Sequence, residues 1–167
     1  MKRFINVKTI LTATGLCSML FAGTAAAEYR VTAFGYSTEY NALLSGNART
    51  AKTILGEVAL IKRDFIEANN LCVAEILARE LLAAERACIV ALEKVDGDRS
   101  IGIVARQSAK ASIYSNLAVA RAMSGDIAEA SNMLETALSF NSRDRNAIAN
   151  YDLMNEKLPA TEIARGF

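Results

Sequence analysis

The apolar positions of residues 111–144 recur three or four residues apart, in two runs separated by a short polar segment. The first run contains Tyr114, Leu117 and Ala118, with Arg121 at the same spacing, and the second contains Ala130, Leu134, Ala137 and Leu138. This spacing places each run along one side of an α-helix. Ser124-Gly125-Asp126 interrupts the pattern, because Gly tolerates a tight turn and Asp126 can cap the next helix. The pattern predicts two helices that face each other.

The same pattern occurs more than once in the chain. The pentapeptide at 70–74, Asn-Leu-Cys-Val-Ala, recurs as Asn-Leu-Ala-Val-Ala at 116–120, and a partial copy begins at Asn150. The second halves also match, since Ala84, Cys88, Ala91 and Leu92 lie 46 residues before Ala130, Leu134, Ala137 and Leu138. Because neither helix of such a pair can bury its apolar side alone, the repeat predicts a stack of helix pairs.

Residues 111–144 resemble the tetratricopeptide repeat (TPR). The family's pattern of large, small and turn residues is matched by Tyr114, Leu117, Ala118, Gly125-Asp126, Ala130 and Ala137. Arg121 and Ser142 depart from it, at positions where the family usually has an aromatic residue and Pro. Residues 65–98 form a degenerate copy, and Gly46-Asn47 followed by Ala51 and Leu55 leaves a weaker trace.

The resemblance implies an all-α fold, a short α-solenoid of antiparallel helix hairpins over residues 47–158. Residues 145–157 would form the capping helix, because a terminal repeat needs a polar outer face. The segment 28–46, with four aromatic residues, is expected to be an extended or irregular lead-in. We expect residues 95–107 to form an inserted loop between the repeats, and residues 159–167 to form a loose tail.

Residues 1–27 have the pattern of a signal peptide. Lys2, Arg3 and Lys8 precede an apolar run of 13 residues, and Ala25-Ala26-Ala27 before Glu28 fits a cleavage site. A retained membrane anchor is the alternative, but a helix that spans a bilayer needs about 20 residues. Lipidation at Cys17 is a further alternative, although Leu16 does not fit the position before a lipidated cysteine. The sequence therefore predicts a periplasmic or secreted protein with no membrane span.

The composition of the chain excludes several kinds of catalytic and binding site. The chain has no His, which excludes Ser-His-Asp and Cys-His nucleophile pairs and His-ligated zinc. Without residues 1–27, it has two more acidic than basic side chains and no basic cluster, so nucleic acid is not an expected partner. Asp96-Gly97-Asp98 suggests a calcium loop, but a solvated turn explains it better because further oxygen ligands are missing. We expect no catalytic residue, no metal site and no cofactor.

Two cysteines remain after residue 27, Cys72 and Cys88. In the repeat frame they lie on the two helices of one hairpin and face each other, so an exported protein is expected to join them in a disulfide. Two buried free thiols that pack as small apolar residues are the alternative. A redox-catalytic role is disfavoured because no C-x-x-C motif is present.

In tetratricopeptide proteins the first helix of each repeat lines a concave groove for a peptide or a partner helix. Carried over by position, this surface would include Asn70, Val73, Ser112, Ser115, Asn116, Val119, Asn146 and Asn150, together with Ile66 and Asn69. Asn70, Asn116 and Asn150 would form a ladder whose amides could pair with the backbone of an extended peptide. Local bonds between neighbouring repeats are the other interpretation. The basic residues of the family's carboxylate clamp are missing.

These patterns predict an exported, TPR-like module that binds a protein or peptide and has no catalytic activity. A structural or envelope-assembly subunit, with possible self-association, is the alternative. A hydrolase that uses two carboxylates is less favoured, since it needs two acids facing one pocket. The sequence does not identify the partner.

Overall fold

The computed structural model describes residues 4–7, 28–35, 37–56 and 59–157, and its fold is all-helical with two short strands. The helices are α1 (Thr38–Leu44), α2 (Ala48–Gly56), α3 (Phe65–Leu77), α4 (Leu81–Gly97), α5 (Ile103–Met123), α6 (Ile127–Phe140) and α7 (Arg145–Lys157), with a 3₁₀ turn η1 at Leu60–Lys62. The strands are β1 (Phe4–Val7) and β2 (Val31–Phe34). Most of the expected signal peptide and all of the expected tail lie outside the described residues.

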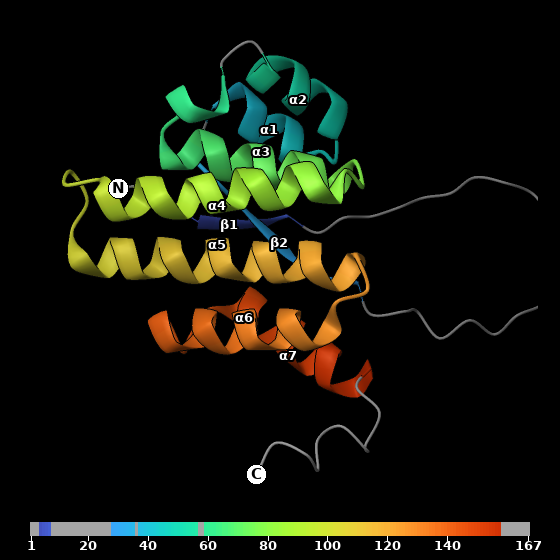
Figure 1. Cartoon of the computed structure of the whole chain (residues 1–167). Coiled ribbons are helices and arrows are strands. Elements are labelled where there is room, and N and C mark those ends of the chain that lie inside the picture. Colours follow the sequence, from blue (N-terminus) through green and yellow to red (C-terminus); the bar gives the residue numbers. More distant parts are fainter. Residues whose placement is uncertain (1–3, 8–27, 36, 57–58, 158–167) are drawn as a thin grey trace, which may run out of the picture.

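The helices stack in chain order, and β2 crosses the stack (Figure 1). Each helix from α1 to α6 packs against the next one along the chain. The odd-numbered helices α1, α3, α5 and α7 also contact one another in order, which puts them in one layer and α2, α4 and α6 in a second. β2 lies on the odd-numbered layer, where it contacts α1, α3 and α5.

Three helix pairs are joined by the same tight turn. Gly46, Arg79 and Gly125 each have a positive φ, and each donates its N–H to the carbonyl three residues earlier. The next residue donates to the carbonyl five residues earlier, which completes a Schellman motif. Asp126 then accepts the N–H of Glu129 at 3.3 Å, which caps α6 as the sequence suggests.

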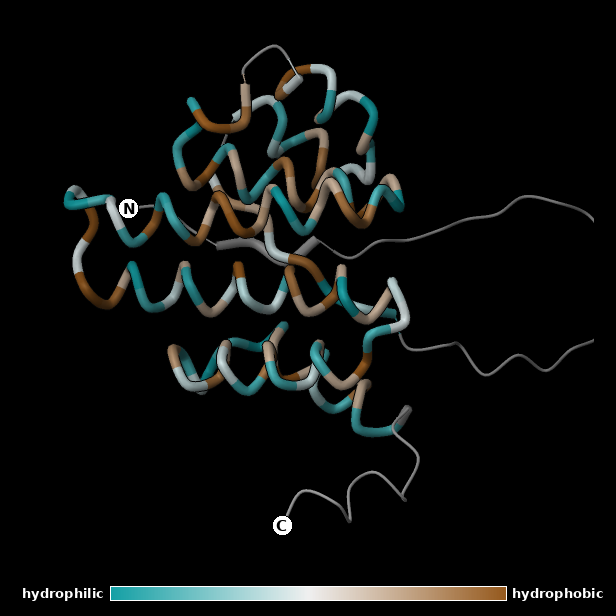
Figure 2. Tube along the Cα trace, viewed as in Figure 1, coloured by the Kyte–Doolittle hydropathy of each residue, from teal (hydrophilic) through white to brown (hydrophobic). Residues whose placement is uncertain are grey.

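The core has a small side chain at the same position in three helix pairs. Ala51, Ala84 and Ala130 occupy the same position after their turns, and each is fully buried. Figure 2 shows apolar and polar positions alternating around the helices, so each helix has an apolar side for its neighbours. No helix in the described part of the chain is long and apolar enough to cross a membrane.

Two expected segments differ from the structure. The lead-in expected at 28–46 is extended or irregular over residues 28–35, but α1 follows because Tyr40 and Leu43, three residues apart, are both buried in the core. The expected loop at 95–107 is much shorter, since α4 continues to Gly97 and α5 begins at Ile103. The capping segment 145–157 coincides with α7.

Candidate functional site

Three asparagines on the odd-numbered helices hold an extended piece of the chain's own backbone. They are Asn70 on α3, Asn116 on α5 and Asn150 on α7, which we call the asparagine ladder. The pairs are Asn70 with Phe34, Asn116 with Thr32, and Asn150 with Arg30. In each pair the side-chain oxygen accepts the backbone N–H at 2.7–2.8 Å, and the side-chain nitrogen donates to the backbone carbonyl at 2.8 Å.

The chemistry of the amide explains this arrangement. A side-chain amide carries both donors and an acceptor, so one asparagine satisfies the N–H and the C=O of a single residue. In an extended strand these two groups of residues 30, 32 and 34 point to the same side, because the strand has a period of two residues. The bound segment, residues 30–34, therefore meets one asparagine at every second residue. The ladder binds main-chain atoms, which every residue except Pro offers.

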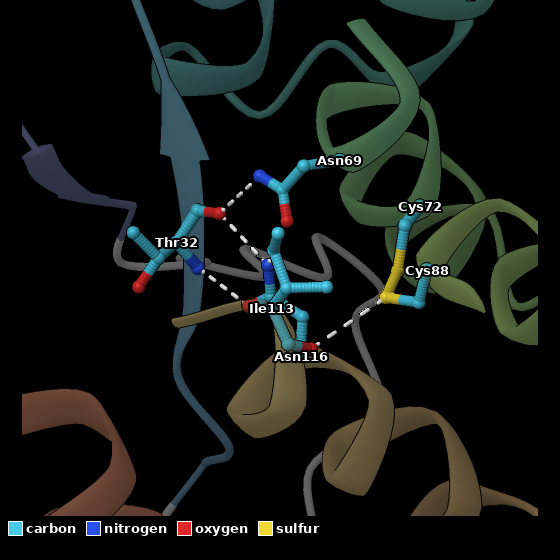
Figure 3. The surroundings of a disulfide bond; sticks show 6 residues. All are labelled: Thr32, Asn69, Cys72, Cys88, Ile113 and Asn116. Carbon is cyan, nitrogen blue, oxygen red and sulfur yellow. Dashed lines mark hydrogen bonds between the residues drawn. A yellow bond between two sulfur atoms is a disulfide. The ribbon is translucent and has the colours of Figure 1, made fainter. Parts of the chain in front are cut away.

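Further polar side chains fix the ladder from the sides. Asn69 donates to the Thr32 carbonyl at 2.9 Å and accepts a bond from Asn116 at 2.8 Å. Asn150 donates to the Ser115 hydroxyl at 3.1 Å. These lateral bonds help to hold the amides of Asn116 and Asn150 in a single orientation. Figure 3 shows Asn69 and Asn116 converging on Thr32.

Two side chains of the bound segment are also contacted. Asn146 donates to the Thr32 hydroxyl at 2.8 Å and, at 3.4 Å, to the Val31 carbonyl. The Phe34 ring lies edge-on to the Phe65 ring, with 6.1 Å between the centroids. The site therefore binds the main chain at residues 30, 32 and 34 and also contacts the side chains of residues 32 and 34.

Cys72 and Cys88 lie beside the ladder. Their Sγ atoms are 2.08 Å apart and their Cα atoms 5.2 Å apart, which is the geometry of a disulfide between α3 and α4. Both residues are fully buried. The bridge lies next to the α4–α5 contact, where the Cys88 sulfur approaches the Ile113 carbonyl at 3.8 Å (Figure 3). It therefore ties α4 to the helix that carries Asn70.

The eight residues of the expected concave surface have different positions. Asn70, Asn116, Asn146 and Asn150 contact the bound segment, whereas Ser115 supports Asn150 and Ser112 donates to Asp144 at 2.8 Å. Val73 and Val119 pack in the core. All eight are buried, because the chain's own residues cover the surface that the repeat frame left open for a ligand. The three ladder asparagines bind an extended backbone, and Asn116 and Asn150 also bond to the preceding odd-numbered helix, at Asn69 and Ser115.

The occupant of the surface could not be found from the repeat frame. The only sequence signal is alternation in Arg30-Val31-Thr32-Ala33-Phe34, a short stretch rich in β-formers before a Gly. Nothing in that stretch specifies which helices it lies on.

A cluster of charged groups lies between neighbouring helix pairs, with Glu75 buried and Glu80 exposed. Lys52 contacts Glu75 at 2.7 Å and Glu80 at 2.6 Å. The hydrogen bond to Glu75, followed by the one to Glu80, raises the pKa of Lys52, and the hydrogen bond from Lys52 lowers the pKa of Glu80. The ladder itself is neutral. Within the described ranges, no group of three or more His, Cys, Asp or Glu residues is placed to hold a metal ion.

Comparison with known proteins gives no relative. No family model, curated protein or solved structure matches the chain significantly.

Proposed function

We propose that this protein is an exported, TPR-like helical repeat module that binds a protein or peptide and performs no catalysis. The observation that carries the proposal is the asparagine ladder, which binds the backbone of an extended segment through paired hydrogen bonds at residues 30, 32 and 34. The partner is expected on the face of the odd-numbered helices, where this segment lies.

The helix arrangement supports the repeat part of the proposal. The α3–α4 and α5–α6 pairs have corresponding positions at a constant spacing of 46, and the turn residues Arg79 and Gly125, both with positive φ, are one such pair. Successive odd-numbered helices contact one another in order, which is the kind of contact expected in a solenoid, where each helix pair packs on its neighbours. A row of equivalent asparagines follows from this repetition, because equivalent positions face the same side.

Two features support export. Residues 1–27 have a basic start, a short apolar run and an Ala-rich end. The Cys72–Cys88 pair has disulfide geometry, and disulfides persist in oxidising compartments such as the periplasm.

Site-specific photo-crosslinking in living cells tests the proposal. A photoreactive phenylalanine analogue would replace Arg30, which is exposed at the end of the bound segment. The matched control carries it at Leu82, which is 72% exposed on α4, in the other layer. We expect a discrete crosslinked protein from position 30 and none from position 82. The absence of any crosslinked protein at position 30, in correctly folded material, would contradict the proposed function.

A second variant links the crosslink to the ladder. Asn116→Ala removes both hydrogen bonds to Thr32 and the bond to Asn69. We expect it to weaken the crosslink from position 30 while the helical circular dichroism stays unchanged. A crosslink of unchanged yield would mean that the partner does not depend on the ladder.

A further inference from the structure

The two edges of β2 are bound differently. The N–H and C=O groups of Arg30, Thr32 and Phe34 point toward the helices and bind the ladder. Because successive residues of a strand point their backbone groups to opposite sides, those of Val31 and Ala33 point away from the ladder. The only described bond to them from a helix is the 3.4 Å contact of Asn146 with the Val31 carbonyl. β2 therefore has an outer edge that the helices leave unpaired.

In this chain the outer edge is paired with β1. The two strands are antiparallel, with Ile5 opposite Ala33 and Val7 opposite Val31. The backbone groups of Val31 and Ala33 face β1. The pairs Ile5–Ala33 and Val7–Val31 are therefore the hydrogen-bonded pairs of the two strands, whereas Asn6 and Thr32 form a pair without hydrogen bonds between them. β1 packs on β2 and has no comparable contact with a helix, so it lies on the outer side of the bound segment.

β1 belongs to the segment that resembles a signal peptide. Residues 4–7 lie before the Ala25-Ala26-Ala27 cleavage pattern, so processing at that site removes β1 and leaves β2 in place. Export would thus vacate the outer edge. A strand edge with free N–H and C=O groups is a template for pairing with another chain.

We propose that the outer edge of β2 binds an extended segment of a partner protein, which adds to β2 as an antiparallel strand in the place of β1. This inference rests on the proposed function and names the form of the partner. The occupant in this structure is a strand of four residues, Phe4-Ile5-Asn6-Val7. The expected partner segment is likewise extended, with β-forming residues and no Pro at its hydrogen-bonded positions.

The asparagine ladder makes this edge usable. An isolated strand of four residues has no fixed conformation in water, so its edge cannot act as a template. Here the bonds from Asn70, Asn116 and Asn150 fix the backbone of residues 30–34 as an extended strand before any partner arrives. Because the edge is already ordered, less conformational entropy is lost on binding.

The first experiment measures whether the edge is free in the exported protein. The full-length gene is expressed, the processed protein is purified from the periplasm, and its start is determined by intact mass. Amide hydrogen exchange is then followed by NMR. We expect a start at Glu28, with the amides of Val31 and Ala33 exchanging faster than those of Thr32 and Phe34. Retention of residues 4–7, or equal protection of all four amides, would overturn the proposal.

The second experiment supplies a strand. The probe is the synthetic peptide of residues 2–8, Lys-Arg-Phe-Ile-Asn-Val-Lys, added to the processed protein. We expect it to slow the exchange of the Val31 and Ala33 amides by roughly tenfold or more, with no change at Thr32 and Phe34. No binding, or protection spread evenly over residues 31–34, would overturn strand addition.

N-methylated peptides provide the matched controls. A methyl group on the nitrogen of Ile5 or Val7 removes a donor that faces β2, whereas one on Asn6 removes a donor that faces outward. The first two peptides are expected to lose binding and the third to retain it. Equal loss in all three would show that the peptide binds in some other way.

The remaining outcomes separate the two proposals. If the processed protein instead forms a dimer whose Val31 and Ala33 amides become protected as its concentration rises, a second copy is the occupant and the proposal of a partner strand fails. If position 30 crosslinks a partner in cells but the peptide does not bind, the proposed function stands and strand addition is wrong. If neither is found, both are wrong.

Discussion

The hairpins α3–α4 and α5–α6 solve one packing problem in two ways. Cys72 and Cys88 occupy the positions that Ala118 and Leu134 hold 46 residues later, and all four side chains are fully buried. The first hairpin joins its helices with a disulfide, whereas the second places the small Ala118 and the large Leu134 in one core cluster. The comparison shows that the repeat frame fixes which positions meet across a hairpin, while the residues that meet there are free to differ.

The same contrast recurs at the turns and at the surface. Arg79, with φ 61°, occupies the position that Gly125 holds with φ 92°, and both complete the same motif. At the surface the polarity of an ion pair is reversed. Lys52 of α2 pairs with Glu75, whereas Glu85 of α4 pairs with Arg121 at the position equivalent to Glu75. In each case the backbone geometry is kept and the side-chain chemistry is exchanged.

Removing the disulfide is expected to have the largest effect. Reduction should lower the free energy of unfolding by about 3 kcal/mol, because the bridge closes a loop with a sequence separation of 16. The double variant Cys72→Ala with Cys88→Leu copies the second hairpin and should recover part of this loss. Chemical denaturation with and without reductant measures both. The comparison of the two hairpins would be wrong if reductant still lowered the unfolding free energy of the double variant, or if it left that of the wild type unchanged.

Overpacking the small position of each hairpin should have a smaller effect. Ala84→Leu and Ala130→Leu place extra volume at equivalent, fully buried crossings, and each should cost about 2 kcal/mol of unfolding free energy. Thermal denaturation of the two single variants measures the losses. A neutral result at either position would mean that the two crossings are not equivalent.

Substitutions of the turn residues Gly125 and Arg79 should change the free energy of unfolding in opposite directions. Gly125→Ala is expected to lower the unfolding free energy by about 1 kcal/mol, because a side chain is strained at positive φ while the space around it is open. Arg79→Gly relieves the same strain and should raise it by roughly 0.5 kcal/mol, after the added freedom of the unfolded chain is subtracted. Ala78→Gly is the matched control, since Ala78 has φ −80° and should only lose stability.

The reversed ion pairs should give the smallest changes. Glu85→Lys places a cation beside Arg121 and should lower the unfolding free energy by about 0.5 kcal/mol, and adding Arg121→Glu should restore it. A double-mutant cycle measures the coupling. A double variant as unstable as the single one would show that the pair contributes through packing rather than charge.

Acid should weaken the ion pair between Lys52 and Glu80. The folded protein has a lowered pKa for this carboxyl, so its stabilising effect is present at neutral pH and is lost as the pH falls through the carboxyl range. Lys52→Gln removes the cause of the shift, so the variant should lose less stability than the wild type between pH 7 and pH 3. Equal losses would assign the acid response to other groups.

The sequence predicts most of the helical core. The repeated apolar spacing places α3 to α7, and the turn at 124–126 and the buried alanines follow from the same frame. The frame also puts Cys72 and Cys88 on facing helices, and Asn70, Asn116 and Asn150 in one row. These predictions succeed because they depend on local periodicity and on equivalence between repeats.

The helical residues that the sequence does not predict have a common cause. The segment 28–46 is expected to be extended or irregular, yet its residues 38–44 form α1. Seven residues are too few to show a clear helical period, and this helix depends on burying Tyr40 and Leu43 against other elements. α4 extends into the expected loop because Val95 is buried by neighbouring helices, and α5 begins inside it with Arg106 donating to the Asp98 carbonyl at 2.6 Å. Tertiary contacts decide such positions.

The sequence by itself determined the helices, their pairing in order, and the row of asparagines, since each follows from spacing along the chain. Only the tertiary structure decided what the asparagines bind. Arg30 is separated from Asn150 by 120 residues, and Thr32 from Asn116 by 84 residues. An amide binds any extended backbone, so its identity names no occupant. Burial of β2 in one register against the odd-numbered helices selects residues 30–34 from all the segments that could pair with it.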